Sequence, residues 1–322
     1  ILMKVEYLSS AGSNIHGFDF GPFITPTDPN QKIGLGHEVA GEVIEVGKNV
    51  TKFKAGDKVL IEPGVPDDTC TYCRTGRYNI CPDVDFMATQ PNYKGALTQY
   101  MTHPEAWTYH IPENMSTLEG ALVEPAAVGM HAAILGGAQV GKSIVILGGG
   151  TIGLMTLQAC LSLGATDITV VDIIEKRLEL AKKLGAKRVI NGKDQDAVAM
   201  LRSEELYGSN GVELVFEAAG SVFTAQQAVQ IVARGGKIII VGTQSQPVPI
   251  EFLKINREVI IQTSFRYCND FPQTIEAIAS GKFNVKDMVT NIYDYKDVQE
   301  AFTDAIDPVK KTDIIKGVVK VG

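Results

Sequence analysis

The stretch SIVILGGGTIGL, residues 143–154, contains three glycines in the spacing G-x-G-x-x-G between a β-branched apolar run and a helix-like run. In this context the spacing indicates a dinucleotide-binding turn. Glycines let the backbone turn tightly and approach a pyrophosphate, whose negative charge is stabilised at the N-terminus of the following helix. We therefore predict that five residues of this loop contact a cofactor: Gly148, Gly150, Thr151, Ile152 and Gly153.

The next strand-like run, DITVVD, ends at Asp172, nineteen residues after Gly153. A carboxylate at this position accepts hydrogen bonds from a ribose diol and repels a 2′-phosphate, which favours NAD over NADP. Arg177 is a further candidate cofactor contact that would favour NADP, although its place in EKRLELAKK is also typical of a solvated helix face. The alternative is a glycine turn needed only for packing, with Asp172 as a helix N-cap.

Around this loop, strand-like and helix-like runs alternate from about Glu124 to Arg266, which predicts a parallel sheet covered by helices on both faces. One of the expected helices is FTAQQAVQIVARGG, residues 223–236. Before Leu122, short β-like runs are bounded by Gly, Pro and Asp and predict a second, β-rich domain. The expected fold class is α/β with a doubly wound Rossmann sheet. We expect three segments: a catalytic domain at 1–124, a dinucleotide-binding domain at 125–264, and a return of residues 265–322 to the catalytic domain.

The composition narrows the setting of the protein. The 322 residues carry a net charge of −7, which disfavours nucleic acid and anionic membranes as partners. The uncharged run 143–166 is long enough to span a bilayer, but its three consecutive glycines divide it into a strand and a helix. Five cysteines, three of them close together, do not form a secreted disulfide framework, and no export signal is visible. We expect a cytoplasmic protein with further residues upstream of Ile1.

A cysteine-rich loop, PGVPDDTCTYCRTGRYNICP at residues 63–82, predicts a metal site, because this spacing in a cytosolic chain is more typical of metal binding than of disulfides. It contains three cysteines: Cys70, Cys73 and Cys81. A structural zinc takes four ligands, and Asp67 continues the step of three residues, with Asp68 as the competing carboxylate. We predict a zinc held by three thiolates and Asp67. The alternative is a loop of reduced thiols without metal.

A second group of potential ligands lies in the β-rich part of the chain. His37 precedes Glu38 in GLGHEVAGEV, and Glu124 ends this part in GALVEPAAVGMHA. One imidazole and two carboxylates near a cleft between domains can hold a catalytic ion with open coordination positions. By spacing alone this evidence is weak, because a lone His-Glu pair is more often part of a surface turn or a strand edge.

Together the motifs resemble a zinc-dependent medium-chain dehydrogenase/reductase, above all its sorbitol (L-iditol, polyol) dehydrogenase branch. They follow the family's order over nearly the whole chain: GSNIHG, GHEVAGEVIEVG, GDKVLIEPGVP, CTYCRTGRYNICPDV, GALVEPAAVGMHA, GGGTIGL and SFRYCNDFP. The resemblance implies a GroES-like catalytic domain and zinc-assisted, NAD-dependent oxidation of a secondary alcohol to a ketone. EPGVP, RYNICPDV and FRYCNDFP favour a polyol of the sorbitol or xylitol type over threonine or butanediol, which are the alternatives.

The resemblance also implies roles for individual residues and a homo-oligomer, since relatives are commonly dimers or tetramers. The implied roles fall into three groups: catalytic zinc contacts at His37, Glu38 and Glu124, substrate contacts at Arg266 and Tyr267, and lining of the substrate and nicotinamide end of the cleft by Ser13 and His16. Glu124 or Glu38 is the candidate acceptor of the substrate proton, through zinc-bound water.

The chain departs from the family at both zinc sites. AGSN replaces the usual CGSD, so Ala11 stands in place of the cysteine ligand and Asn14 in place of the aspartate. Asp67 stands where the structural site of the family usually has its first cysteine. Gly17 stands where an aromatic residue commonly follows the histidine of the catalytic loop, here His16. Because Ala11 has no donor atom, two hypotheses follow: an active polyol dehydrogenase with an altered catalytic site, and an NAD-binding protein with little turnover.

Overall fold

The computed structural model describes residues 1–21, 26, 28, 30–89 and 93–322. The chain forms two compact units: the first comprises Ile1–Pro125, Cys268–Ser280 and Val289–Gly322, and the second comprises Ala126–Tyr267 and Gly281–Met288. The domain boundaries differ from the expected ones by a few residues. The segment 281–288, which we expected in the catalytic domain, packs with the second unit, where the backbone N–H of Asn284 donates to Gln158 Oε1 over 2.8 Å.

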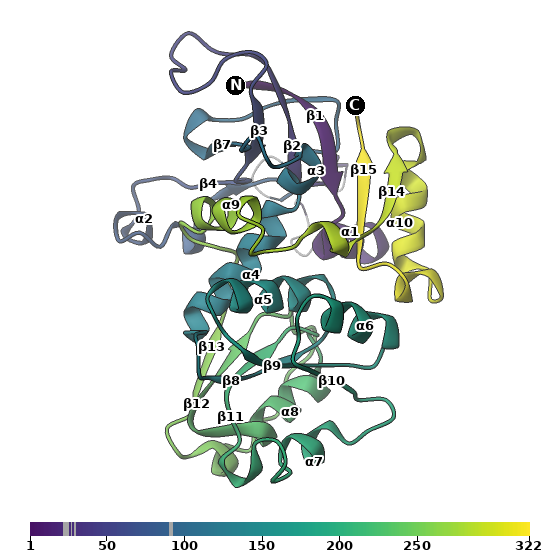
Figure 1. Ribbon diagram of the computed structural model, residues 1–322. Coiled ribbons are helices and arrows are strands. Elements are labelled where there is room, and N and C mark those ends of the chain that lie inside the picture. Colours follow the sequence, from purple (N-terminus) through teal and green to yellow (C-terminus); the bar gives the residue numbers. More distant parts are fainter. Residues whose placement is uncertain (22–25, 27, 29, 90–92) are drawn as a thin grey trace. The chain divides into compact units, whose positions relative to one another are not determined.

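A seven-stranded sheet forms the centre of the first unit (Figure 1). Its strands are β1 (Leu2–Ser9), β2 (Glu38–Glu45), β3 (Lys58–Ile61), β6 (Tyr100–Thr102), β7 (Thr108–His110), β14 (Val289–Asp294) and β15 (Lys316–Lys320). The order is β14-β15-β1-β2-β3-β7, with β6 also paired to β1. The last strand, β15, therefore pairs antiparallel with the first, with Ser9 opposite Val318.

Shorter elements complete the first unit: α1 (Gly12–Phe20), β4 (Gly64–Val65), α2 (Thr71–Arg74), β5 (Asp85–Phe86), α3 (Thr117–Gly120), α9 (Phe271–Ala279) and α10 (Val298–Ile306). In β1, Met3 and Val5 face the core at the spacing of two that a strand dictates. A register irregularity between Val5 and Tyr7 then brings Leu8 into the same core. This packing fixes the end of β1 and the start of β2, where Glu38 lies.

The second unit is a six-stranded parallel sheet with helices on both faces. Its strands are β8 (Ser143–Leu147), β9 (Asp167–Asp172), β10 (Arg188–Asn191), β11 (Val212–Glu217), β12 (Val232–Ile240) and β13 (Ile260–Thr263). The helices are α4 (Val123–Gly136), which begins in the first unit, α5 (Thr151–Ser162), α6 (Glu175–Lys183), α7 (Ala197–Leu201) and α8 (Val222–Ile231). Figure 1 shows α5 and α6 on one side of the sheet and α7 and α8 on the other. The order β10-β9-β8-β11-β12-β13 reverses at β8, where ligands of such sheets bind.

The helices and strands of the second unit test two expectations from the sequence, one for residues 143–166 and one for residues 223–236. The uncharged run 143–166 folds as β8 and α5, and no helix in the described part of the chain is long and apolar enough to cross a membrane. The helix expected over 223–236 is wrong in its C-terminal part, because α8 ends at Ile231 and β12 begins at Val232. Gly235 has a φ of 67°, which a right-handed helix does not accommodate.

Candidate functional site

The glycine loop joins the carboxyl end of β8 to α5 at the point where the sheet order reverses. Gly148 has a φ of 108°, and a Cβ there would lie 2.8 Å from the backbone nitrogen of Ala219. A Cβ on Gly153 would lie 1.8 Å from the carbonyl oxygen of Gly148. Both positions therefore require glycine for the strand, loop and helix to approach this closely.

Helix α5 presents its N-terminus at this loop. Gly150 is the N-cap residue, and Thr151 and Ile152 form the first turn, both half-buried. The first backbone N–H groups of a helix have no partner within the helix and carry partial positive charge, so they bind anions. The five predicted cofactor contacts thus lie together at a helix end suited to a pyrophosphate.

Asp172 holds the glycine loop from the end of β9. Its Oδ2 accepts a hydrogen bond from the backbone N–H of Gly149 (2.6 Å), and its Oδ1 accepts bonds from Ile173 and Ile174 (2.8 and 2.9 Å). Ile174 is the N-cap residue of α6, so Asp172 is not the helix cap that the packing alternative assumed. Its carboxylate lies at the carboxyl edge of the sheet, where a ribose diol is bound in this fold.

Arg177 does not lie on a solvated helix face, and that interpretation is wrong. Its Nη1 lies 3.8 Å from Asp172 Oδ2, and its side chain is only 25% exposed. A Cβ on Gly149 would lie 3.4 Å from the Arg177 Cβ, so the arginine packs against the glycine loop. The charged sequence of α6 gives no sign of this contact, because the partner of Arg177, Asp172, belongs to the neighbouring strand β9. The guanidinium is thus placed beside the carboxylate that is predicted to bind the ribose.

The residues His37, Glu38 and Glu124 come together in the first unit. All three are buried, and each offers one potential ligand atom within 4.8 Å of the others. Glu38 opens β2, whereas Glu124 lies in the first turn of α4, so the fold brings together groups far apart in sequence. One imidazole nitrogen and two carboxylate oxygens are acceptable zinc ligands that leave a coordination position open. The donor set therefore fits a catalytic zinc.

Two residues that the sequence motifs did not indicate hold Glu38 in place. The hydroxyl of Ser9, at the end of β1, donates to Glu38 Oε2, and the Nζ of Lys316 lies 2.5 Å from the same oxygen. Lys316 also donates to the carbonyl oxygen of Ser10 over 2.8 Å. In the sequence KGVVKVG this lysine is typical of a strand edge, so no sequence signal distinguishes it.

Ala11 has no donor atom to contribute to this group. It is buried, follows Ser9 by two residues, and is the N-cap residue of α1. Ser13 and His16 lie within α1, where Ser13 is exposed and the ring of His16 is 5.2 Å from that of Phe20. Among the described residues neither belongs to a cluster of potential ligands. Their role in lining the substrate site stays a prediction.

Arg266 and Tyr267 end the long segment of the second unit. Arg266 has a φ of 54°, in the left-handed region that non-glycine residues seldom adopt. Its guanidinium carbon lies 4.7 Å from the ring centroid of Phe265, and Tyr267 is buried. Strained backbone conformations concentrate at functional sites. The strain is consistent with substrate binding by Arg266, which stays a prediction.

The cysteine loop forms the second cluster of potential ligands. The four ligand atoms lie within 4.8 Å of one another and come from Asp67, Cys70, Cys73 and Cys81. Helix α2 begins after Cys70 and brings the Cys73 Sγ to 3.4 Å from the Cys70 Sγ. Asp67 Oδ1 lies 3.3 Å from the Cys73 Sγ, whereas Asp68 is not part of the cluster. Three thiolates and one carboxylate fit a closed, structural zinc site.

The potential ligands of this loop differ in their protonation. The backbone N–H groups of Cys70 and Thr69 donate to Asp67 Oδ1 over 3.0 and 2.9 Å and hold the pKa of this carboxyl well below its usual range. Desolvation, with hydrogen bonds to Cys70 and Asp67, raises the pKa of Cys73 to about 12. Asp67 is therefore charged at neutral pH, whereas a metal must displace the proton of Cys73.

We expect Asp67→Ala to lose the zinc of the cysteine loop and to lower the melting temperature by about 5 °C or more, because the binding free energy of a structural zinc adds to the stability of the fold and one of its four ligands is removed. Zinc content by mass spectrometry and thermal unfolding measure the two effects. Asp67→Asn is the matched control, since it keeps an oxygen for the N–H groups of Thr69 and Cys70 but loses the charge. Zinc content and stability that are both unaffected in Asp67→Ala would show that Asp67 is not the fourth ligand.

Glu62 is a buried carboxyl group that the sequence motifs did not single out. It is fully buried directly after β3 and accepts hydrogen bonds from the hydroxyls of Tyr78 (2.6 Å) and Tyr109 (2.9 Å). Tyr78 belongs to the cysteine loop, and its hydroxyl also accepts a bond from the backbone N–H of Asn269 (2.8 Å). Glu62 thereby anchors the cysteine loop to the sheet and to the segment that returns from the second unit.

We expect Glu62→Gln to become more stable relative to the wild type as the pH rises. Burial raises the pKa of Glu62 to about 7, with a contribution from the charge of Asp270 and against the two tyrosine hydrogen bonds. Because this folded pKa exceeds the unfolded value near 4.5, the wild type loses about 3 kcal/mol between pH 4.5 and 7, and the uncharged variant does not. Denaturant titrations at pH 5 and pH 8 measure the free energies of unfolding. An equal offset at both pH values would contradict the raised pKa.

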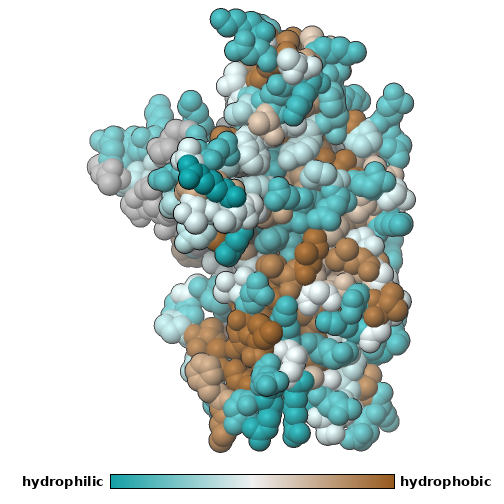
Figure 2. Space-filling view, turned by 90° about the vertical axis from the view of Figure 1, so that its left-hand side faces the viewer, coloured by the Kyte–Doolittle hydropathy of each residue, from teal (hydrophilic) through white to brown (hydrophobic). Residues whose placement is uncertain are grey.

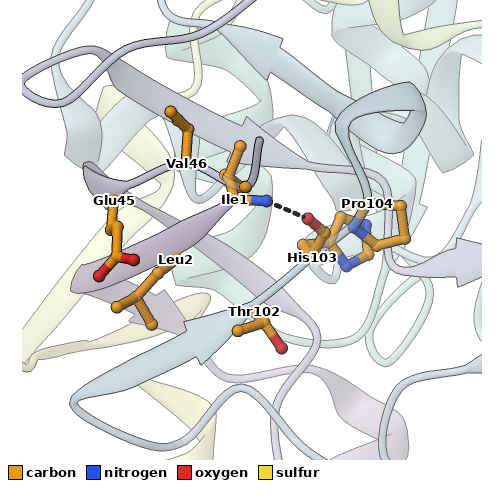
Figure 3. A pocket seen from close by; sticks show the side chains of 8 residues that line it. Ile1, Leu2, Glu45, Val46, Thr102, His103 and Pro104 are labelled. Carbon is orange, nitrogen blue, oxygen red and sulfur yellow. Dashed lines mark hydrogen bonds between the residues drawn. The ribbon is translucent and has the colours of Figure 1, made fainter. Parts of the chain in front are cut away.

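Figure 3 shows a pocket of about 530 Å³ at the start of β1. Leu2, Glu45 and Val46 contribute to its lining, and the ammonium group of Ile1 donates to the carbonyl oxygen of His103 over 2.9 Å. With a rise of about 3.3 Å per residue, the pocket lies roughly 20 Å from the other end of β1, where Ser9 contacts Glu38. It shares no lining residue with either ligand cluster, and we assign it no catalytic role.

Comparison with known proteins agrees with both units. Two family models match, the alcohol dehydrogenase GroES-like domain over residues 1–113 and the zinc-binding dehydrogenase over residues 151–280. The zinc-type alcohol dehydrogenase-like protein YdjJ of Escherichia coli K12 is 62% identical over 321 residues, which are 100% of this chain and 91% of that protein. Sorbitol dehydrogenase of Bacillus subtilis 168 is 40% identical over 318 residues, which are 95% and 86% of the two chains. A crystal structure of an Escherichia coli oxidoreductase of unknown specificity has a TM-score of 0.97 at 61% identity, covering 100% of this chain and 92% of that one.

These matches define an alcohol dehydrogenase that uses zinc and a nicotinamide cofactor and is built from a GroES-like and a Rossmann domain. More narrowly, the chain belongs to the zinc-dependent medium-chain dehydrogenase/reductase family, in its sorbitol dehydrogenase branch. The predicted family, fold class and cofactors are thereby confirmed. The assignment of individual residues to zinc, cofactor and substrate stays a prediction.

Proposed function

We propose that this protein oxidises a secondary hydroxyl group of a small polyol, of the sorbitol or xylitol type, and transfers the hydride to NAD. The observation that carries the proposal is the buried group of His37, Glu38 and Glu124, whose potential ligand atoms lie within 4.8 Å of one another. Histidine and carboxylate ligands alone hold zinc in other enzymes, so the group suits a catalytic zinc without a thiolate. The 40% identity to a sorbitol dehydrogenase supports the class of substrate.

Within this proposal, each buried group near the metal has its own task. His37, Glu38 and Glu124 hold the zinc, which when bound polarises the alcohol oxygen and lowers its pKa. Glu124 is the preferred acceptor of the hydroxyl proton, because Lys316 already engages Oε2 of Glu38. The glycine loop and Asp172 bind the pyrophosphate and ribose of NAD and so position the ring that receives the hydride.

Recognition of the other substrate hydroxyls is assigned to Arg266 and Tyr267, with Ser13 and His16 lining the site. A guanidinium has five N–H donors in a fixed plane, which suits a molecule with several neighbouring hydroxyl oxygens. The left-handed backbone of Arg266 supports a functional role, since the strain needs a reason to persist. This substrate end is what favours a polyol over threonine or butanediol.

NADH production from sorbitol, xylitol, threonine and 2,3-butanediol tests the proposed function, with zinc content measured on the same sample. We expect turnover of a polyol that a chelator abolishes. Turnover of threonine or butanediol alone would replace the polyol by the alternative substrates. Measurable NADH binding without turnover of any of the four would favour the second candidate, an NAD-binding protein with little activity, which the loss of a thiolate at Ala11 supports.

We also propose that the chain forms a homo-oligomer, a dimer or tetramer, through the second unit. β13 is an edge strand of the parallel sheet, and Ile260, Ile261 and the neighbouring Phe265 are exposed. Figure 2 shows hydrophobic surface, in brown, gathered on this unit. An exposed apolar edge strand is suited to pairing with another chain. Light scattering in solution tests this, and Ile261→Lys should lower the molar mass; an unchanged mass would exclude this edge as the interface.

The proposed location is the cytoplasm. All five cysteines are free, and three of them are the predicted thiolate ligands of the cysteine loop. Free thiols persist in a reducing compartment. Cell fractionation with an antibody to the protein tests the location, and recovery outside the cytosolic fraction would contradict it.

A further inference from the structure

Lys316 carries a buried positive charge beside the catalytic cluster. Its side chain is 3% exposed and that of Glu38 is 4% exposed, and the Lys316 Nζ lies 2.5 Å from Glu38 Oε2. The ammonium group also donates to the carbonyl oxygen of Ser10 over 2.8 Å, and the Ser9 hydroxyl donates to the same oxygen of Glu38. Protein groups therefore engage one oxygen, Oε2, of the Glu38 carboxylate.

The charges of the cluster explain why a lysine is buried there. Glu38 and Glu124 are both buried, with potential ligand atoms within 4.8 Å of each other. Two carboxylates this close repel each other, and an uncompensated buried charge is strongly destabilising. A divalent cation and the ammonium of Lys316 both relieve this repulsion. The two positive charges also repel each other, and the low dielectric of a buried site makes that repulsion strong.

We propose that Lys316 is an internal counter-ion that competes with the catalytic metal for the negative charge of Glu38. It stabilises the first unit without metal and lowers the affinity of the cluster for divalent cations. The inference rests on the proposed function in one respect, namely that His37, Glu38 and Glu124 are the metal ligands. In a site without a thiolate at position 11, this competition decides how readily the metal dissociates.

Titration of the full chain with Co²⁺ tests the counter-ion role, because Co²⁺ bound to histidine and carboxylates lacks the thiolate charge-transfer band that marks the cysteine loop. We expect Lys316→Met to bind Co²⁺ at the cluster at least about tenfold more tightly than the wild type. Its melting temperature without metal should fall and should recover when Co²⁺ is added. Lys316→Arg keeps the charge and should keep the wild-type affinity. Lys310→Met is the matched control, since it removes a lysine 2.6 Å from Asp304 away from the cluster, and should not change the affinity.

The outcomes separate the counter-ion role from other roles. A lower melting temperature of Lys316→Met with unchanged Co²⁺ affinity would show that Lys316 is a structural residue only and would overturn the proposal. A weaker Co²⁺ affinity would also overturn it, because it would mean that Lys316 orients Glu38 for the metal. Lys316→Gln gives the same test if the methionine variant does not fold. His37→Ala separates this proposal from the proposed function. If Co²⁺ binds to this variant as tightly as to the wild type, the cluster is not the metal site, and both proposals are overturned. If Co²⁺ binding requires His37 but its affinity does not change with the charge at position 316, only the proposed counter-ion role of Lys316 is overturned.

Discussion

Replacing Ala11 by cysteine is expected to tighten zinc binding at the catalytic cluster about 100-fold and to raise turnover of polyols. If the four ligands of a zinc site together contribute about 10–16 kcal/mol, one thiolate contributes on the order of 3 kcal/mol, which is about 100-fold in affinity. Ala11 is buried and lies two residues after Ser9, whose hydroxyl contacts Glu38. Its φ of −80° and ψ of 144° are accessible to cysteine without strain.

Zinc retained after dialysis against a series of chelators, together with kcat/KM for a polyol, measures the effect of Ala11→Cys. Ala11→Ser is the matched control, because serine has nearly the size of cysteine but offers no thiolate, and it should stay close to the wild type. If Ala11→Cys changes neither zinc retention nor turnover, position 11 does not supply a ligand in this protein. The altered catalytic loop would then not explain any difference in activity from the relatives.

Asp172→Asn is expected to shift the preference between the cofactors about 100-fold or more toward NADP. The change removes the charged hydrogen bonds that Asp172 is predicted to make to the ribose diol, each of which contributes about 1.5–3 kcal/mol, and it removes the predicted repulsion of a 2′-phosphate. Arg177, whose Nη1 lies 3.8 Å from the carboxylate, becomes available to bind that phosphate. Asparagine keeps an oxygen for the N–H of Gly149, so the glycine loop should stay in place.

Initial rates with NAD and NADP, and binding of NADH and NADPH by fluorescence, measure the shift in Asp172→Asn. Adding Arg177→Met to this variant is the control: it should abolish the gain with NADP while the loss with NAD remains. If the single variant keeps the wild-type preference, the ribose is not bound at Asp172. If the double variant keeps the gain with NADP, Arg177 does not contact the phosphate.

The parts of the fold that the sequence predicted are those set by local patterns. The order of β8, glycine loop and α5 follows from an apolar run, three glycines and a helix-forming run, because each requirement acts within a few residues. The helix expected over 223–236 fails for the complementary reason: Val232 pairs with Val212 in the neighbouring strand, and a distant partner overrides the local preference.

The candidate sites show the same division. The spacing of the cysteines and the position of Asp67 were sufficient to predict a four-membered cluster, because short loops bring such residues together. For His37, Glu38 and Glu124, spacing alone favoured a surface turn or a strand edge, and the prediction of a metal site depended on the resemblance to a family. Arg177 was misinterpreted because its partner Asp172 belongs to a different element.

The sequence by itself determined which donor atoms the protein has: an alanine without a donor at position 11, an aspartate at position 67, and a carboxylate after the second strand of the Rossmann domain. Only the tertiary structure decided which charges meet. Lys316 reaches Glu38 because β15 pairs with β1, and Glu62 meets Tyr78 because the cysteine loop folds back on the sheet. Chemical identity is a property of single residues, whereas burial and strand pairing, which select the partner of each charge, act between segments far apart in the chain.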